Sequence, residues 1–266
     1  MAEVAGGSDP GRLIVTLLHE LLAAIDSDAP VADVRVGLHW TVLLTADGRA
    51  GIANANLMPH EHGSADVEAA GTLIGRSARE VAGWALNGRP VERGIGVAAI
   101  NALLPLPARA DDPVAPGSHL LTDLNAADLL LERAPGKTVV VVGHFPFLPQ
   151  LEAVAGRLFI LERDPAPGEY PASAAAEIVP QADVAAITGS AIVNGTLEEL
   201  LGLCRPDAYV VVLGPSTPLH PLVLRRGVAA IAGSIVTEPR VCMEYVSQAS
   251  TYRQLRGVRK MVLLRR

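Results

Sequence analysis

The chain has 266 residues, with 22 Lys and Arg against 28 Asp and Glu, so its formal net charge is −6. Half of the residues are hydrophobic and 19% are charged, which excludes a mainly disordered chain. No apolar run approaches the roughly 20 residues of a membrane span, and no cluster of Lys and Arg predicts a nucleic-acid surface. The length is sufficient for two domains of ordinary size.

The N-terminus and the cysteines indicate a cellular compartment. The first ten residues lack the basic and apolar segments of a secretory signal. Cys204 and Cys242 are the only cysteines, and the chain has enough apolar residues to fold without a disulfide. We therefore expect a cytoplasmic protein with two reduced thiols. Whether identical chains associate is left open.

The first predicted elements are a helix and a hairpin. Leucines at helical spacing predict an amphipathic helix over residues 12–25. Alternating apolar residues predict a strand over 34–44, and Asp47-Gly48 predicts a tight turn into a second strand over 49–55.

Two more helices and a linker complete the N-terminal part. Ser77-Ala-Arg-Glu80 is a capping box that predicts a helix to about Asn87, and a further apolar helix is expected over 96–104. Prolines and adjacent aspartates follow, which is typical of a linker. We therefore predict an α+β domain over 1–104, a linker over 105–118 and a second domain over 119–266.

The second domain alternates strands and helices. The strands are expected at 138–142, 158–161, 184–187, 209–213, 228–232 and 260–264, and the helices at about 146–155, 196–204, 219–226 and 238–250. Continuous β-branched runs such as Thr138–Val142 are typical of strands buried on both faces of a parallel sheet. The alternation predicts a Rossmann-like, doubly wound α/β sheet.

Small and polar residues follow four of these strands. Because ligands bind outside the carboxyl ends of parallel strands, we expect these residues to line one cavity. The candidate cofactor-binding residues are Gly143, His144, Phe145, Glu162, Thr188, Gly189, Asn194, Gly214, Pro215, Ser216 and Thr217. Trp40 and Asn101 are candidate substrate contacts from the other domain.

Glu162 ends the second strand, where Rossmann folds commonly place a carboxylate against ribose hydroxyls. A solvent-facing acid is the equal alternative. The glycine-rich fingerprint of dinucleotide sites is absent, since His144, Phe145 and Pro146 occupy that turn. NAD is therefore disfavoured more strongly than S-adenosylmethionine, which carries no phosphate.

Two other features have competing interpretations. Gly214-Pro-Ser-Thr-Pro218 leads toward a helix, so it is either an anion site or a proline-stiffened turn with a cap. His60, His62, His144 and His220 are candidate ligands of a transition metal, although loop histidines are more often solvated. No nucleophile motif or P-loop is present, so the sequence does not identify a catalytic nucleophile or general base.

The motifs together resemble one family. They are Val-Gly-His-Phe-Pro-Phe147, Glu162 followed by Pro-Ala-Pro-Gly168, Ile-Thr-Gly189, Val-Asn-Gly-Thr196 and Leu-Gly-Pro-Ser-Thr-Pro218. The family is a prokaryotic one of unknown function labelled "putative heavy-metal chelation". Gly37-Leu-His-Trp-Thr41 is similar to part of its companion domain, which resembles the N-terminal domain of enolase. The resemblance implies an active-site-like cleft between the domains and no established reaction.

Two functions follow as expectations. The first is a small-molecule-binding protein or enzyme whose interdomain cleft holds an adenosyl or other anionic ligand, such as S-adenosylmethionine or a nucleotide, linked to metal or metallophore handling. The alternative is a non-catalytic protein that chelates or senses a heavy metal through His, Glu and Cys ligands. Whether the protein is an enzyme is left open.

Overall fold

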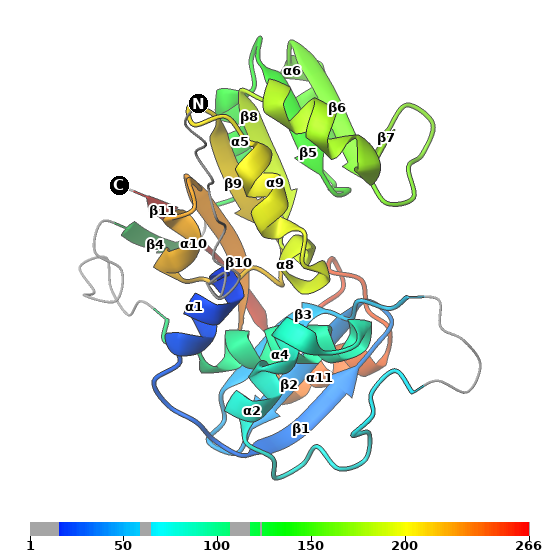
Figure 1. The fold of residues 1–266 in the computed structure, drawn as a ribbon, viewed down its shortest axis with the longest axis vertical. Coiled ribbons are helices and arrows are strands. Elements are labelled where there is room, and N and C mark those ends of the chain that lie inside the picture. The colour runs from blue at the N-terminus through cyan, green and yellow to red at the C-terminus, as the bar shows by residue number, and fades with distance from the viewer. Residues whose placement is uncertain (1–15, 59–64, 107–117, 123, 266) are drawn as a thin grey trace, which may run out of the picture.

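The computed structural model describes residues 16–58, 65–106, 118–122 and 124–265, which form two sheets (Figure 1). The N-terminal part contains α1 (Leu17–Ala23), β1 (Val31–Val36), β2 (Trp40–Thr45), β3 (Ala50–Asn54), α2 (Ala78–Ala82), α3 (Trp84–Asn87) and α4 (Pro90–Leu103). The following part contains β4 (Ser118–Thr122), α5 (Ala126–Arg133), β5 (Thr138–Val142), α6 (Leu148–Val154), β6 (Arg157–Glu162), β7 (Tyr170–Pro171), η1 (Ala172–Ala174), α7 (Ala175–Ile178) and η2 (Val179–Gln181). The last part contains β8 (Val184–Thr188), α8 (Ser190–Asn194), α9 (Leu197–Leu203), β9 (Tyr209–Leu213), α10 (Pro221–Leu224), β10 (Ala230–Val236), α11 (Pro239–Ser247) and β11 (Val258–Arg265).

The large sheet has the strand order β4-β11-β10-β9-β8-β5-β6-β7. Its six strands from β10 to β7 run parallel, in the 3-2-1-4-5-6 order of doubly wound nucleotide-binding folds. The predicted strands at 138–142, 158–161, 184–187 and 209–213 are confirmed as four neighbours in this sheet. The order of strands reverses between β5 and β8, and ligands bind at such a switch point in other folds of this type.

The other edge of the large sheet departs from the parallel pattern. β11 pairs antiparallel with β10, and β4 pairs antiparallel with β11. The strand predicted at 260–264 is therefore present, but it is not the outermost strand of the sheet. Because β11 is antiparallel, its first residues lie at the same edge as the carboxyl end of β10, with Val258 opposite Val236.

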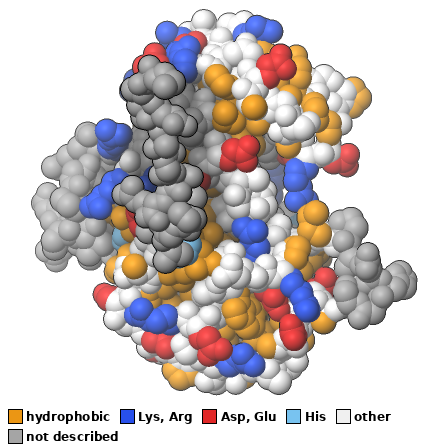
Figure 2. Space-filling model, viewed as in Figure 1, with side chains coloured by type: hydrophobic (Ala, Val, Ile, Leu, Met, Phe, Trp, Pro, Cys, Tyr) orange, Lys and Arg blue, Asp and Glu red, His pale blue; other side chains and the backbone are white. Residues whose placement is uncertain are grey.

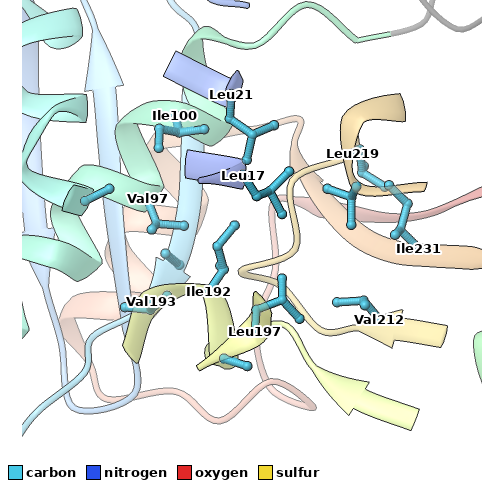
Figure 3. Packing of buried hydrophobic residues seen from close by; sticks show 14 of the residues in the cluster. Leu17, Leu21, Val97, Ile100, Ile192, Val193, Leu197, Val212, Leu219 and Ile231 are labelled. Atoms are coloured by element: carbon cyan, nitrogen blue, oxygen red, sulfur yellow. The ribbon is translucent and has the colours of Figure 1, made fainter. Parts of the chain in front are cut away.

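Alternate residues of the parallel strands face two helical layers. Val139 and Val141 face α5 and α6, whereas Val140 belongs to the buried cluster on the opposite face, with residues of α7, α9 and α10. Burial on both faces explains the continuous apolar runs of these strands. The cluster that contains Val140 also includes residues of α1, α4 and α8, which meet side chains of β9 and β10 (Figure 3). The two parts of the molecule therefore share one core.

The small sheet has the order β1-β2-β3, with all strands antiparallel. The single strand predicted over 34–44 is wrong: a tight turn at Gly37 divides it into β1 and β2. The Gly37 N–H donates to the carbonyl of Trp40 at 2.8 Å, and a side chain at Gly37 would overlap the Val246 carbonyl of α11. The alternating pattern continues through the turn, so the break is not visible in the sequence.

The predicted capping box is confirmed in its first half, because the Ser77 hydroxyl accepts a hydrogen bond from the Glu80 N–H at 3.0 Å. The Glu80 carboxylate pairs with the Arg76 guanidinium at 3.5 Å. The helix predicted from residue 96 starts earlier, at Pro90, whose fixed φ suits the first helical position. α4 packs directly on β3, where a Cβ on Gly51 would overlap the backbone of Ala98. A glycine there permits the close approach.

α11 comes late in the chain but lies against the small sheet, beside β2 (Figure 1). Its Cys242, Met243 and Val246 pack in one buried cluster with Val42 and Ile52. The predicted linker covers residues 105–118, and residues 107–117 lie outside the described part of the chain. The domain boundaries at 104 and 119 therefore stay a prediction.

The described residues contain no helix that is long and apolar enough to cross a membrane. Basic and acidic side chains are interspersed over the lower half of the face drawn in Figure 2. That part of the surface therefore carries no broad patch of one sign.

Candidate functional site

The carboxyl ends of the parallel strands open into a cleft of about 1750 Å³. One wall is formed by the loops that follow β5, β6, β8 and β9. The lining also contains Trp40 and Asn54 of the small sheet and parts of the segment 251–262. The cleft therefore lies where open α/β sheets hold their ligands.

Most of the predicted site residues meet in this cleft. Its lining includes Gly143, His144, Phe145, Glu162, Thr188, Asn194, Gly214, Pro215 and Trp40. Their roles toward a ligand stay predictions. The sequence interpretation missed other lining residues, among them Asn56, Arg163, Tyr252, Arg253, Arg256 and Lys260. No local motif marks the last four, because the antiparallel β11 and the loop before it bring them to this edge.

Ser216, Thr217, Gly189 and Asn101 are not part of the lining. The Ser216 hydroxyl accepts a hydrogen bond from the Asn54 N–H at 2.8 Å, and the Asn101 amide donates to the Ser216 carbonyl at 3.2 Å. Gly189 lies against Thr217, where a Cβ would overlap the Thr217 hydroxyl. These residues join the loop after β9 to β3, α4 and α8 rather than facing the cleft.

His220 also lies outside the lining and is only 7% exposed. It precedes α10, and its Nδ1 accepts a hydrogen bond from the Leu222 N–H at 3.4 Å. Burial, assisted by the nearby Arg225 guanidinium, lowers the pKa of His220 to about 4. The imidazole is therefore a neutral helix cap at pH 7, with one nitrogen already occupied.

Glu162 ends β6 with its side chain half-buried in the cleft lining. Its Oε2 accepts a hydrogen bond from the Arg163 N–H at 3.1 Å. The neighbouring Arg163 guanidinium reaches the segment that follows β3, with Nη1 3.3 Å from the Met58 sulfur. Glu162 therefore keeps acceptor capacity at the place where Rossmann folds bind ribose.

His144 follows Gly143, which adopts a φ of +106°. Its Nδ1 lies 3.1 Å from Oε1 of Glu169, a residue that the sequence interpretation did not single out. Glu169 belongs to the loop between β6 and β7, 25 positions away, so no spacing rule connects the two residues. His144 itself lines the cleft.

Aromatic rings occupy both ends of the lining. Phe145 and Phe147 stack with centroids 5.1 Å apart and planes inclined by 12°. At the other end, Trp40 and Tyr252 lie 5.9 Å apart, and the Lys260 ammonium sits 5.2 Å from the Tyr252 centroid. The cleft thus offers apolar surfaces suited to a planar ligand group, next to cations.

The charge of the lining is opposite in sign to that of the whole chain. Among the described residues of the lining, Arg163, Arg253, Arg256 and Lys260 are cationic, whereas Glu162 and Glu199 are the only acids. The chain as a whole carries −6. A concave surface of one sign concentrates ligands of the opposite sign, so this lining favours an anion.

A metal centre needs several ligating side chains around one ion. Within residues 16–58, 65–106 and 124–265, no three His, Cys, Asp or Glu side chains lie close enough to hold one ion. Burial raises the pKa of Cys204 to about 11 and that of Cys242 to about 12, so neither is a ready thiolate ligand. His60 and His62 lie outside the described residues. The described side chains therefore do not fit a closed metal site.

Two solved structures that are similar over nearly the whole chain are described as proteins of unknown function. A protein from Desulfitobacterium hafniense is 27% identical, with a TM-score of 0.76 over 94% of this chain and 98% of that one. A protein from Pyrococcus horikoshii is 20% identical, with a TM-score of 0.72 over 92% of this chain and 97% of that one. Both are described as DUF364 proteins, and they support the two-part α/β fold.

Sequence comparisons agree with these structures. An uncharacterized protein from Methanocaldococcus jannaschii is 25% identical over 251 residues, which cover 90% of this chain and 92% of that protein. The DUF4213 family profile, described as "putative heavy-metal chelation", matches residues 18–104. The DUF364 profile carries the same description and matches residues 125–265, which is more than half of the chain. The chain therefore belongs to the DUF364 family, as the motifs after the parallel strands predicted.

Proposed function

We propose that this protein binds an anionic small molecule in the cleft at the carboxyl edge of its parallel sheet, with a ribose-bearing group beside Glu162. The observation that carries the proposal is the excess of cations in the lining of an acidic chain. The cleft of about 1750 Å³ is larger than the roughly 300–1,000 Å³ of a pocket for one small molecule, and its lining combines aromatic rings with polar groups, as small-molecule sites do.

The strand order gives the cleft a length. Five strand spacings separate β6, which carries Glu162, from β11, which carries Lys260. At about 4.8 Å per spacing this is about 24 Å. The cleft therefore accommodates either one extended ligand or two ligands. The two would be a nucleoside near Glu162 and an anion near Arg253 and Lys260. Such a pair of ligands is what a group-transfer enzyme requires.

Trp40 provides a direct reporter for the test. The chain has two tryptophans, and Trp84 lies in α3, outside the lining of the cleft. In a Trp84→Phe variant, fluorescence reports on Trp40 alone. Titration with AMP, adenosine and citrate separates the ribose from the charge, and S-adenosylmethionine tests the adenosyl ligand without phosphate.

We expect AMP to bind more tightly than adenosine, and its affinity to fall as salt rises. Arg253→Ala is the charge variant, because its exposed side chain lines the cleft. A charge-assisted hydrogen bond contributes about 1.5–3 kcal/mol, so AMP or citrate affinity should fall about 10- to 150-fold. Arg259→Ala is the matched control, since Arg259 is exposed on β11 but does not line the cleft. Equal losses in both variants, or no binding by any of the four probes, contradict the proposal.

Direct metal binding is the second candidate function, and the family description favours it. His144 and Glu162 are candidate ligands in the cleft, and His39 and Glu199 also belong to its lining. Metal analysis of untagged protein, followed by titration with Zn²⁺, Ni²⁺, Co²⁺ and Cu²⁺, tests it. Stoichiometric uptake that is lost in His144→Ala supports chelation in the cleft, whereas no tight uptake excludes this candidate.

A further inference from the structure

The contact between His144 and Glu169 is asymmetric in its burial. Nδ1 of the imidazole lies 3.1 Å from Oε1 of the carboxylate. The imidazole side chain is 67% exposed and lines the cleft, whereas the Glu169 side chain is only 9% exposed. In an ordinary surface ion pair both partners are solvated, and such pairs contribute little. In this pair the Glu169 carboxylate is largely buried, whereas the His144 imidazole is exposed.

Both oxygens of the Glu169 carboxylate have partners. Oε1 meets His144, and Oε2 accepts a hydrogen bond from the Ala166 N–H at 2.9 Å. The Glu169 N–H donates back to the Ala166 carbonyl at 2.9 Å, and Gly168 between them adopts a φ of +93°. This closed turn fixes the carboxylate before any ligand arrives.

The ends of three paired strands lie close to both residues. Val142 of β5, Leu161 of β6 and Tyr170 of β7 lie in one row across three neighbouring parallel strands. His144 lies two residues after Val142, in the loop that follows β5, and Glu169 is the last residue of the loop before β7. Both loops are therefore anchored at strands of one sheet.

An ionised carboxylate only accepts hydrogen bonds, so the bond at 3.1 Å requires the proton of a neutral imidazole to sit on Nδ1. Neutral imidazoles in water favour the other tautomer, with the proton on Nε2. We propose that Glu169 is a positioning residue that holds the His144 proton on Nδ1, so that Nε2 faces the cleft as its proton acceptor.

The chemical role follows from this tautomer. Nε2 accepts a proton from an acidic O–H or N–H group of the bound molecule, which leaves the conjugate base of the ligand and an imidazolium. Glu169 stabilises the imidazolium through the same hydrogen bond. This role rests on the proposed binding of a ligand in the cleft, but the tautomer exists without any ligand and is tested separately.

The tautomer is measured by ¹⁵N NMR of the histidine side chains at a pH where the ring is neutral, with the signals assigned from a His144→Ala variant. We expect Nδ1 protonated and Nε2 unprotonated in the parent protein. Glu169→Ala should return the ring to the Nε2-protonated form. Glu177→Ala is the matched control, because Glu177 is an exposed acid on α7 that does not line the cleft, and it should leave the tautomer unchanged.

Access to Nε2 is measured with diethyl pyrocarbonate, which acylates unprotonated imidazole nitrogens. Peptide mapping should place the adduct on His144, and saturating AMP should slow its formation. An Nε2-protonated ring in the parent protein, or an unchanged tautomer in Glu169→Ala, overturns the positioning role. If Trp40 fluorescence shows that AMP binds but the modification of His144 is not slowed, the proton-acceptor role is overturned. Failure of AMP, adenosine, citrate and S-adenosylmethionine all to bind contradicts the proposed function instead, and leaves the tautomer result standing.

Discussion

The Ser216 hydroxyl accepts a hydrogen bond of 2.8 Å from the Asn54 N–H, although the two residues are 162 positions apart. Asn54 ends β3 of the small sheet, and Ser216 follows β9 of the large one. Asn101 of α4 strengthens the junction, since its amide donates to the carbonyls of both Ile52 and Ser216. The two parts of the molecule are therefore joined by buried polar contacts as well as by a shared core.

The first prediction concerns this junction. Ser216 is 1% exposed, so Ser216→Ala leaves the Asn54 N–H without its acceptor. The free energy of unfolding, measured by urea denaturation, should fall by about 1–3 kcal/mol. Ser247→Ala is the control, because Ser247 is exposed at the end of α11, and it should change stability by less than about 0.5 kcal/mol. Equal effects of the two variants would show that the hydrogen bond contributes nothing.

The second prediction tests the close contact between Gly189 and Thr217. In Gly189→Ala the new Cβ would overlap the Thr217 hydroxyl and lie 2.8 Å from the Thr217 backbone nitrogen. Because backbone atoms cannot move aside, the variant should lose about 1–3 kcal/mol of stability. Gly202→Ala offers a contrast, since its Cβ in α9 meets nothing within 4 Å and should gain up to about 1 kcal/mol. A Gly189→Ala protein as stable as the parent would contradict this packing.

The third prediction is a pH dependence that comes from His220. Its pKa of about 4 in the folded protein lies below the value of 6.5 expected in the unfolded chain. The unfolded state therefore binds more protons between these values, and stability falls as the pH is lowered from about 6.5 to about 4. The loss attributable to His220 should be about 1–3 kcal/mol.

His220→Asn isolates this effect, because Asn also caps helices but does not titrate. Urea unfolding of both proteins at pH 7.5 and pH 4.5 gives the comparison. The difference between the two pH values should be smaller in the variant than in the parent. The same pH dependence in both proteins would mean that His220 is not the titrating group.

The fourth prediction concerns Glu162. If its carboxylate accepts hydrogen bonds from ribose hydroxyls, Glu162→Ala leaves those donors unpaired. AMP should then bind about 5- to 150-fold more weakly, which corresponds to about 1–3 kcal/mol. The melting temperature should hardly change, since Glu162 is half-buried at the end of a strand and its protein partner is the exposed Arg163. Trp40 fluorescence and thermal unfolding measure the two quantities. Unchanged AMP affinity removes the ribose role of Glu162.

The sequence by itself determined the local elements of the parallel sheet. The run Thr138–Val142 became β5, because β-branched side chains favour an extended backbone. Ser77 became a helix cap, because its hydroxyl accepts a hydrogen bond from the N–H three residues later. The positions of the loops after the strands followed from those elements. Their meeting in one cleft followed from the parallel order, which places carboxyl ends at one edge.

Only the tertiary structure decided the partners of the site residues. Glu169, in the loop before β7, reaches His144, in the loop after β5, and Ser216 is turned away from the cleft by Asn54. Lys260 enters the cleft because β11 runs antiparallel to its neighbour. Each of these contacts depends on strand order and on packing between segments far apart in the chain. Periodicity and capping rules describe only neighbouring residues, so they contain no information about such contacts.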